Sequence, residues 1–587
     1  MNIQERDLLN ELCREPFVNQ RILAEKSGYS LGKVNQSLKN LQAEGCLDAD
    51  MRPTARAQAF FEENKPQSAI ILAAGFGMRM VPINREVPKG LLKVNGEILI
   101  ERLIEQLHRA GIREITVVVG FMKEAFEYLI DRYGVDLKVN PEYAVKNNLH
   151  SLALVSDRIA NSYILPSDIW CGETPFRERE AYSWYMVGDI MDDDSYVRVN
   201  RKQELVRTAQ GGNQMIGVSY IAGEDAAQLR ERINAMDADS AYDGSFWEDA
   251  LFERDKMLVG ARVVSAKNTY EVNTYEQLRE MDSFSPNLKS KILDLIASVL
   301  GADEEEIEAI TVLKKGMTNR SFLFSCRGRQ YIMRIPGEGT EKLINRREEY
   351  EVYQAIRDLQ LSDEICYMDP ESGYKMTVYM ENARVCDAEN PQDVRRCMQT
   401  LRSFHEKGLH VDHYFDVFEK IEYYESLWLR PESCYRDYRE TKRKIFTLKR
   451  YIESQPKELV LSHIDSVADN FLFVPGEEGE QVRIIDWEYG SMQDPHIDIA
   501  MFGIYSLYNR EQMEGLIDTY FPEGCDPAAR LKLYCYIAAC GLLWSNWCEY
   551  KLQLGVEFGE YSLGQYRYAK DYYKIFQEEQ EKLQHGV

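Results

Sequence analysis

The sequence predicts a multidomain protein of α/β and α+β type, in which a small helical segment precedes two larger domains. The chain has 587 residues, which is too long for one hydrophobic core and is typical of roughly three or four domains. After residue 69, short apolar runs alternate with amphipathic stretches, as strands and helices do around a parallel sheet. A third region follows a linker at residues 283–287 and becomes increasingly helical toward its end.

The composition is that of an ordinary globular protein, with 44% hydrophobic and 28% charged residues. No stretch approaches the roughly 20 apolar residues of a membrane helix, and the first residues lack a signal peptide pattern. The twelve cysteines include no C-x-x-C pair, so we expect free thiols and a cytoplasmic protein. The net charge of −25 disfavours nucleic acid and anionic membranes as general partners, which leaves small molecules as the expected ligands.

Residues 1–64 are predicted to be mainly helical. Ser30 is the expected N-cap of a helix that ends at Gly45, a shorter helix precedes it at 21–27, and residues 46–54 can form a small wing. The segment resembles winged helix-turn-helix DNA-binding modules. It holds eight basic and ten acidic residues, whereas a DNA-binding module is usually clearly basic. DNA binding, dimerisation and docking therefore stay open as its role.

Residues 67–283 are predicted to form an α/β domain. The apolar runs 69–73 and 114–119 have the character of buried parallel strands, and residues 99–110 and 123–133 are expected to be helices. In such a domain, ligands bind at the carboxyl edge of the sheet.

A glycine-rich segment directly follows the first of these strands, and Pro88-Lys89 comes soon after it. Glycines allow backbone N–H groups to approach a polyphosphate, and an arginine adds a guanidinium for phosphate oxygens. A G-x-G pair alone indicates only a tight turn, but together with Pro88-Lys89 it is specific for a nucleotide site. The candidate nucleotide-binding residues of this segment are Ala73, Ala74, Gly75, Gly77 and Arg79.

The segment resembles the sugar-nucleotide and choline-phosphate nucleotidyltransferase family, whose pattern is L-A-A-G-x-G-x-R followed by P-K. The resemblance covers about residues 69–280 and sharpens toward choline-phosphate cytidylyltransferases at four places, which are 147–152, 163–168, 183–185 and 271–274. It implies a Rossmann-like fold in which Lys89 is the catalytic cation on the phosphates and Asp168 holds Mg²⁺. The other positions that the resemblance implies are Asn148 for the nucleotide, Trp184 and Tyr185 for the substrate, and Glu271 and Asn273 for the metal.

These residue types suit nucleotidyl transfer. A phosphomonoester oxygen attacks the α-phosphorus of a nucleoside triphosphate, so two anions meet and need a metal and a fixed cation. Asp168 ends an apolar strand beside the expected crevice, although a surface turn would also account for it. Family members often have an aspartate where this chain has Asn273. An asparagine brings no charge, so the metal is expected to depend more on Glu271.

The third region, residues 287–587, begins with a helix and predicted strands and contains H-x-D-x-x-x-x-N from His463 onward. About fifteen residues later comes I-I-D-W-E at 484–488. This is the catalytic arrangement of the bilobal protein-kinase-like fold: one Asp orients the attacking hydroxyl, an Asn binds a metal, and a later Asp binds the metals on the phosphates. Asp465, Asn470 and Asp486 take these roles.

Upstream, the predicted nucleotide loop contributes Gly316, Thr318 and Asn319. Arg334 stands where a strand lysine usually holds the phosphates, with Glu349 as its helix partner. The stretch 311–350 resembles bacterial choline kinases of the aminoglycoside phosphotransferase-like superfamily, and the resemblance covers about 290–575. No A-P-E signature follows the second motif, so the acceptor is expected to be a small hydroxyl compound.

Three aromatic residues are candidates for a cage around a quaternary ammonium group: Tyr489, Trp544 and Trp547. Two tryptophans three residues apart share one helix face, which is also how core residues are spaced. Both interpretations stay open.

Together, the two resemblances imply phosphorylation of choline with ATP and then transfer of CMP from CTP to phosphocholine, with Mg²⁺ as the cofactor. The CDP-choline formed would serve the decoration of surface glycans or lipids. One alternative keeps both reactions but acts on ethanolamine, another amino alcohol or a phosphonate. Another alternative is a DNA-binding regulator that senses metabolites.

Overall fold

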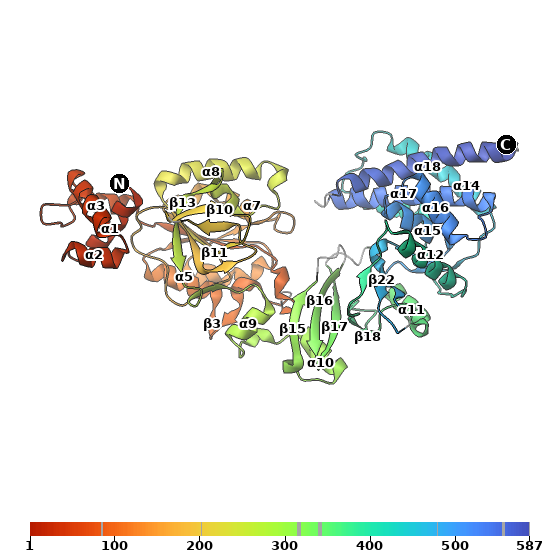
Figure 1. Cartoon of the computed structure of the whole chain (residues 1–587), viewed down its shortest axis with the longest axis horizontal. Coiled ribbons are helices and arrows are strands. Elements are labelled where there is room, and N and C mark those ends of the chain that lie inside the picture. Colours follow the sequence, from red (N-terminus) through yellow and green to blue (C-terminus); the bar gives the residue numbers. More distant parts are fainter. Residues whose placement is uncertain are drawn as a thin grey trace. The chain divides into compact units, whose positions relative to one another are not determined.

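A computed structural model of the protein describes residues 1–83, 86–200, 202–313, 319–337, 343–477, 479–553 and 558–585. The chain forms two compact units, Met1–Leu295 and Ile296–Val587. Figure 1 labels their helices and strands and colours them along the sequence. Their division falls within helix α10 (Lys291–Leu300), a few residues after the predicted linker. The boundaries of the three predicted domains stay a prediction. Within the described ranges, no helix is long and apolar enough to cross a membrane.

The first unit begins with a winged helix-turn-helix, as predicted. Its helices are α1 (Ile3–Arg14), α2 (Gln20–Ser27), α3 (Leu31–Ala43) and α4 (Ala55–Glu63). Ser30 is the N-cap of α3, and Gly28 has a φ of 70°, which allows the tight turn between α2 and α3. An antiparallel bridge between Leu47 and Pro53 closes the small wing.

This N-terminal module shares a hydrophobic core with the domain that follows it. Ala181 packs among the leucines of the helices, including Leu8 and Leu9. Asp7 of α1 accepts hydrogen bonds from the hydroxyls of Tyr29 and Tyr182, the latter at 2.9 Å. Burial raises the pKa of Asp7, and these two hydroxyls together with the charges of Arg262 and Arg177 oppose that effect.

The middle domain is built on a large twisted sheet. Its parallel part has the order β5 (Asp136–Val139), β4 (Glu114–Val119), β1 (Ser68–Ala73) and β6 (Ser162–Pro166), which confirms the predicted parallel strands. Beyond β6 the sheet becomes mixed, through the strands β11 (Gly212–Ile221), β8 (Trp184–Asp192), β13 (Lys256–Val264), β10 (Glu204–Arg207) and β9 (Val197–Val199).

Helices cover both faces of this sheet, as Figure 1 shows for α5 (Leu99–Arg109) and α8 (Gly223–Asp237). The alternation of side chains along β1 explains the arrangement: Ile71 packs in the core beneath α5, whereas Ile70 packs in the core beneath α8. The helix predicted at 123–133 is a 3₁₀ turn followed by α6 (Tyr128–Tyr133). A two-stranded ribbon of β7 (Ile169–Cys171) and β14 (Thr269–Glu271) brings a distant segment beside the end of β6.

The second unit has two lobes, in agreement with the predicted kinase-like fold. One lobe is an antiparallel sheet of β15 (Ile307–Val312), β16 (Asn319–Cys326), β17 (Arg329–Pro336), β19 (Lys375–Val378) and β18 (Ile365–Met368), accompanied by α11 (Arg346–Ile356). The other lobe is mainly helical, with α12 (Pro391–His405), α13 (Val417–Ser426), α14 (Tyr438–Ser454), α15 (His496–Tyr505), α16 (Arg510–Tyr520), α17 (Pro527–Gln553) and α18 (Glu560–His585). Short strands β21 (Val460–Ser462), β22 (Phe471–Val474), β23 (Gln481–Ile484) and β24 (Ser491–Gln493) carry the catalytic motifs.

Candidate active sites

The glycine-rich segment of the middle domain forms a loop directly after β1. Gly77 has a φ of 64°, a conformation that favours glycine. A Cβ atom at this position would stand 2.9 Å from Cγ of Lys89. The glycine therefore permits both the turn and the close approach of the Lys89 side chain.

Lys89 donates hydrogen bonds to side-chain oxygens of residues that are distant in sequence. Its Nζ donates to Oδ2 of Asp168 at 3.0 Å and to Oδ1 of Asn273 at 2.8 Å. Arg79 donates to the same Asn273 oxygen at 2.9 Å. Asp168 follows β6, and Glu271 ends β14, so the ribbon of β7 and β14 delivers the last members of this cluster. The structure thus brings the predicted catalytic and metal-binding residues together.

The cluster is suited to a hard cation. Burial raises the pKa of Glu271, and the negative charge of Asp168 adds to the effect. Among the residues that the structure describes, no group of three or more His, Cys, Asp or Glu side chains forms a ready metal site. Mg²⁺ is usually held by one or two carboxylates together with substrate phosphates and water, and Asp168, Glu271 and the amide oxygen of Asn273 fit that pattern.

The other residues predicted for this site have different surroundings. The Asn148 side chain accepts a hydrogen bond from the backbone of Trp247 at 2.8 Å, so its contact with a nucleotide stays a prediction. Trp184 and Tyr185 are 1% and 0% exposed. The guanidinium of Arg262 lies 3.6 Å from the centre of a Trp184 ring, and the Tyr185 hydroxyl donates to Glu248 at 3.1 Å. Both rings are buried in this structure, and their contacts with substrate stay a prediction.

Glu248 is a buried acid that the sequence analysis missed. Its side chain lies in a 3₁₀ turn (Trp247–Leu251) and is 7% exposed. Its Oε2 atom has no hydrogen-bond partner within the described part of the chain. Burial raises the pKa of Glu248 to about 7, since an apolar environment disfavours the charged form.

Glu248→Gln is expected to change the pH dependence of stability. The pKa of Glu248 in the folded protein is raised above its ordinary value of 4.5, so folding favours the protonated side chain. The stability that the protonated Glu248 contributes is fully present below about pH 4.5 and is lost as the pH rises through about 7. The neutral glutamine should therefore stabilise the domain by about 3 kcal/mol at pH 8.5 and by little at pH 5. Thermal unfolding at both pH values measures this difference. Asp249→Asn, at the neighbouring and more exposed carboxylate, is the matched control, and parallel pH profiles for wild type and Glu248→Gln would refute the expectation.

The catalytic loop of the second unit is held by hydrogen bonds to its backbone. Asp498 of α15 accepts from the backbone N–H of His463 at 2.8 Å and of Ile464 at 2.7 Å, and His405 bonds the same carboxylate at 2.9 Å. Ile464 has a φ of 68°, so these bonds maintain an unfavourable backbone conformation. Asp498 was missed because its role depends on contacts far apart in sequence.

The predicted catalytic residues of this loop converge. Asp465 accepts a hydrogen bond on Oδ1 from the hydroxyl of Tyr505 at 2.7 Å. The Asn470 amide donates to the backbone oxygen of Asp465 at 2.8 Å, which turns the amide nitrogen toward the loop. Asp486 follows β23 with a φ of 64°. The oxygens of Asn470 and Asp486 are ligands of the kind that Mg²⁺ takes together with nucleotide phosphates.

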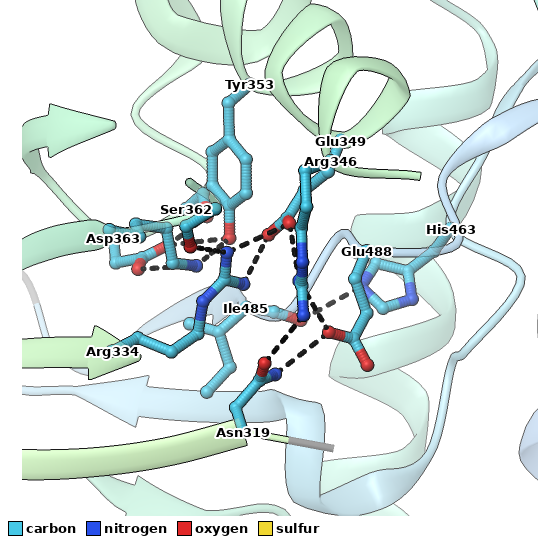
Figure 2. Close-up of polar contacts among 12 residues, drawn as sticks. Asn319, Arg334, Arg346, Glu349, Tyr353, Ser362, Asp363, His463, Ile485 and Glu488 are labelled. Carbon is cyan, nitrogen blue, oxygen red and sulfur yellow. Dashed lines mark hydrogen bonds and ion pairs between the residues drawn. The ribbon is translucent and has the colours of Figure 1, made fainter. Parts of the chain in front are cut away.

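Arg334 and Glu349 form the predicted ion pair between strand β17 and helix α11. The pair is bidentate and fully buried, with one N–O distance of 2.9 Å, and Figure 2 shows both side chains. Burial alone would raise the pKa of Glu349, but the charge of Arg334 and its hydrogen bonds hold it down to about 2. The role of Arg334 toward phosphates stays a prediction.

The network in Figure 2 extends further than the sequence predicted. Arg346 donates to Glu349 at 2.8 Å and to Oδ1 of Asn319 at 2.8 Å. The Asn319 amide in turn donates to Glu488 at 2.9 Å, two residues after the Asp486 position. Asn319 thus connects the start of β16 to the metal-binding motif. Gly316 and Thr318 lie outside the described residues.

The three aromatic residues predicted as a cage lie in one cluster. The ring of Trp544 is 6.1 Å from Tyr489 and 5.5 Å from Trp547. Tyr505 and Tyr561, which the sequence analysis missed, join them: the Tyr505 ring is 5.2 Å from Trp544 and 6.4 Å from Tyr561. We call Tyr489, Tyr505, Trp544, Trp547, Phe558 and Tyr561 the aromatic cluster.

The aromatic cluster belongs to the core and also reaches the catalytic loop. Trp544 and Trp547 are only 5% and 4% exposed, as core residues are. Through Tyr505, however, the cluster contacts Asp465 directly. The Nζ of Lys551 lies 5.7 Å from the centre of the Trp547 ring, so this ring already has a cation over its face.

Three family models match successive parts of the chain. They are described as winged helix-turn-helix DNA-binding at residues 1–47, MobA-like NTP transferase domain at 69–171, and choline/ethanolamine kinase at 310–516. The choline-phosphate cytidylyltransferase of Streptococcus pneumoniae is 32% identical over 233 residues, which are 37% of this chain and 98% of that protein. The chain belongs to the choline-phosphate cytidylyltransferase family.

Other relatives match the same two regions. The 2-aminoethylphosphonate cytidylyltransferase of Lancefieldella rimae is 32% identical over 230 residues, covering 37% of this chain and 92% of that protein. The crystal structure of choline kinase LicA from Streptococcus pneumoniae covers 48% of this chain and 98% of that chain, at 30% identity and a TM-score of 0.43.

These matches show to which kind of domain each of the two sites belongs. The cytidylyltransferase domain contains the cluster around Lys89, and the choline/ethanolamine kinase domain contains the catalytic loop at Asp465 and the metal-binding position Asp486. The chain is therefore a transferase that combines both kinds of domain. Trp544, Trp547 and Tyr561 lie beyond the range 310–516 that the kinase model matches.

Proposed function

We propose that the chain phosphorylates choline with ATP in its kinase domain and couples the phosphocholine to CMP from CTP in its cytidylyltransferase domain, giving CDP-choline. Choline is supported as the substrate by the aromatic cluster, which contacts Asp465 directly through Tyr505. A trimethylammonium group has no strong N–H donors, so aromatic faces are the surfaces that can select it. A hydroxyl attached to such a group would then lie near the catalytic carboxylate.

In the kinase reaction, Asp465 orients the acceptor hydroxyl and accepts its proton. The Asp498 carboxylate keeps the loop backbone in place for this role. The ion pair of Arg334 and Glu349 fixes the strand arginine near the nucleotide phosphates. We assign Mg²⁺ to Asn470 and Asp486, where it would neutralise charge on the phosphates.

In the cytidylyltransferase reaction, Lys89 and Arg79 supply the fixed positive charge that two approaching anions require. The loop glycines allow backbone N–H groups to face the triphosphate. We assign a second Mg²⁺ site to Asp168, Glu271 and Asn273, with the same function of charge neutralisation. Both nucleoside triphosphates are cytoplasmic metabolites, so we place both reactions in the cytoplasm.

We propose that the N-terminal module serves to dock against the cytidylyltransferase domain. Its core is shared with the cytidylyltransferase domain through Ala181 and Tyr182, and its basic residues do not outnumber its acidic ones.

A single incubation tests the proposal. The purified protein is mixed with choline, ATP, CTP and Mg²⁺, and the products are separated and identified by mass. CDP-choline is expected, with phosphocholine as the intermediate. Parallel incubations replace choline by ethanolamine or by 2-aminoethylphosphonate, the last without ATP. Faster product formation from either of these than from choline would reject choline as the substrate.

Trp547→Ala is expected to weaken the use of choline by roughly a few-fold to tens of fold, because one cation–π contact is worth roughly 0.5–2 kcal/mol. The KM for ATP should change little. The measurement is the KM and kcat of the kinase reaction for choline and for ATP.

Trp547→Phe is the matched variant, since it keeps an aromatic face and should retain most of the choline affinity. Thermal unfolding of both variants separates binding from packing. Equal losses for choline and ATP, together with a lower melting temperature, would show that Trp547 acts only in the core.

A further inference from the structure

Tyr505 places a hydroxyl group on the catalytic carboxylate. It is the last residue of helix α15, and its OH group donates to Oδ1 of Asp465 at 2.7 Å. An acceptor alcohol would make the same kind of contact, because its O–H must donate to this carboxylate before its oxygen attacks phosphorus.

Both oxygens of the carboxylate already have a donor nearby, and Oδ1 has the Tyr505 hydroxyl. Its other oxygen, Oδ2, lies 3.4 Å from the Asn470 amide nitrogen, beside a proposed metal ligand. Asp465 itself is half-buried. An acceptor hydroxyl that approaches Oδ1 therefore meets the Tyr505 hydroxyl there.

We propose that Tyr505 occupies the acceptor's place on Asp465 while no acceptor is bound. In this way it suppresses hydrolysis of ATP by the kinase domain. The inference rests on the proposed kinase function of Asp465. In the reaction that Tyr505 suppresses, a water oxygen bonds to the γ-phosphorus, and the bond from that phosphorus to the β–γ bridging oxygen breaks. ADP and phosphate form, and the proton of the water passes to Asp465.

The surroundings of Tyr505 give the acceptor a means of displacing it. Its ring lies between Trp544 and Tyr561 in the aromatic cluster, where the acceptor's ammonium group is proposed to bind. The side chain is half-buried and stands at the end of its helix, just before Leu507 with a φ of 53°. An ammonium group that enters the cluster contacts the same ring whose hydroxyl covers the carboxylate.

Tyr505→Phe tests the inference, because it keeps the ring and removes the hydroxyl. ATP hydrolysis without choline is expected to rise by about tenfold, the factor that one hydrogen bond to a charged group is worth. The KM for choline should fall by a few-fold, since a competitor has been removed and the ring is kept. Release of phosphate and formation of phosphocholine are measured separately.

Tyr508→Phe is the matched control. It also loses a buried hydroxyl, which donates to the backbone oxygen of Ala388 rather than to Asp465, and it should leave acceptor-free hydrolysis at the wild-type rate. If Tyr505→Phe instead lowers kcat by tenfold or more without raising hydrolysis, Tyr505 positions Asp465 during the reaction and the inference is overturned. Unchanged hydrolysis and unchanged KM would also overturn it. A wild-type protein that forms no phosphocholine would reject the proposed function itself, which is a different outcome.

Discussion

Replacement of Asp465 by asparagine is expected to slow phosphorylation of choline strongly and to leave cytidylylation of phosphocholine intact. The carboxylate is the group that orients the acceptor hydroxyl and takes its proton, and an amide of the same shape cannot take that proton. The rate of phosphocholine formation should therefore fall by roughly 10²- to 10⁴-fold. Formation of CDP-choline from supplied phosphocholine and CTP should stay at the wild-type rate, because the Lys89 cluster lies in the other compact unit.

Asp469→Asn is the matched control for this variant. It removes an exposed carboxylate from the same loop, four residues away, and should keep most of the kinase activity. Loss of both activities in a folded Asp465→Asn protein would contradict the assignment of one reaction to each domain.

Lys89→Ala is expected to have the opposite effect. Its ammonium group lies at 3.0 Å from Asp168 and 2.8 Å from Asn273, so its removal takes the fixed cation from a cluster of oxygens. Such a loss of preorganised charge stabilisation typically costs about 10²- to 10³-fold in rate. Formation of CDP-choline from phosphocholine and CTP should fall by this factor, while phosphorylation of choline is unchanged.

Lys93→Ala provides the comparison, because Lys93 is an exposed lysine four residues further along the same segment. It should retain cytidylylation. If Lys89→Ala kept more than about half of the wild-type rate at saturating CTP, Lys89 would not be the catalytic cation.

The sequence predicted those parts of the two sites that depend on short motifs. Lys89 and Asp168 belong to local patterns at strand ends, and the spacing of Asp465, Asn470 and Asp486 is set by one hairpin, so the fold brings them together almost automatically. The first strands and helices of the middle domain were predictable for a similar reason, since each carries its own periodicity.

Contacts between segments that are distant along the chain could not be predicted from the sequence. Arg262 covers Trp184 because β13 pairs with β8, a pairing across some eighty residues that no local pattern reveals. Alternation along β8 indicates that its residues are buried on one face or the other, but not which of them faces a ligand. Tyr505 and Tyr561 lie on separate helices without a motif, so only the packing of α15 and α18 against α17 identifies them.

The core that the N-terminal module shares with the cytidylyltransferase domain limits where this chain can be divided. The module covers Ala181 and Tyr182 of the cytidylyltransferase domain. A recombinant fragment that starts at residue 65 would expose this apolar area and leave the Tyr220 hydroxyl without the Asn64 carbonyl that accepts its hydrogen bond at 2.6 Å. Polar substitutions at Ala181 and Tyr182 would make this exposed area hydrophilic. The substituted fragment should then aggregate less than the same fragment with the native residues.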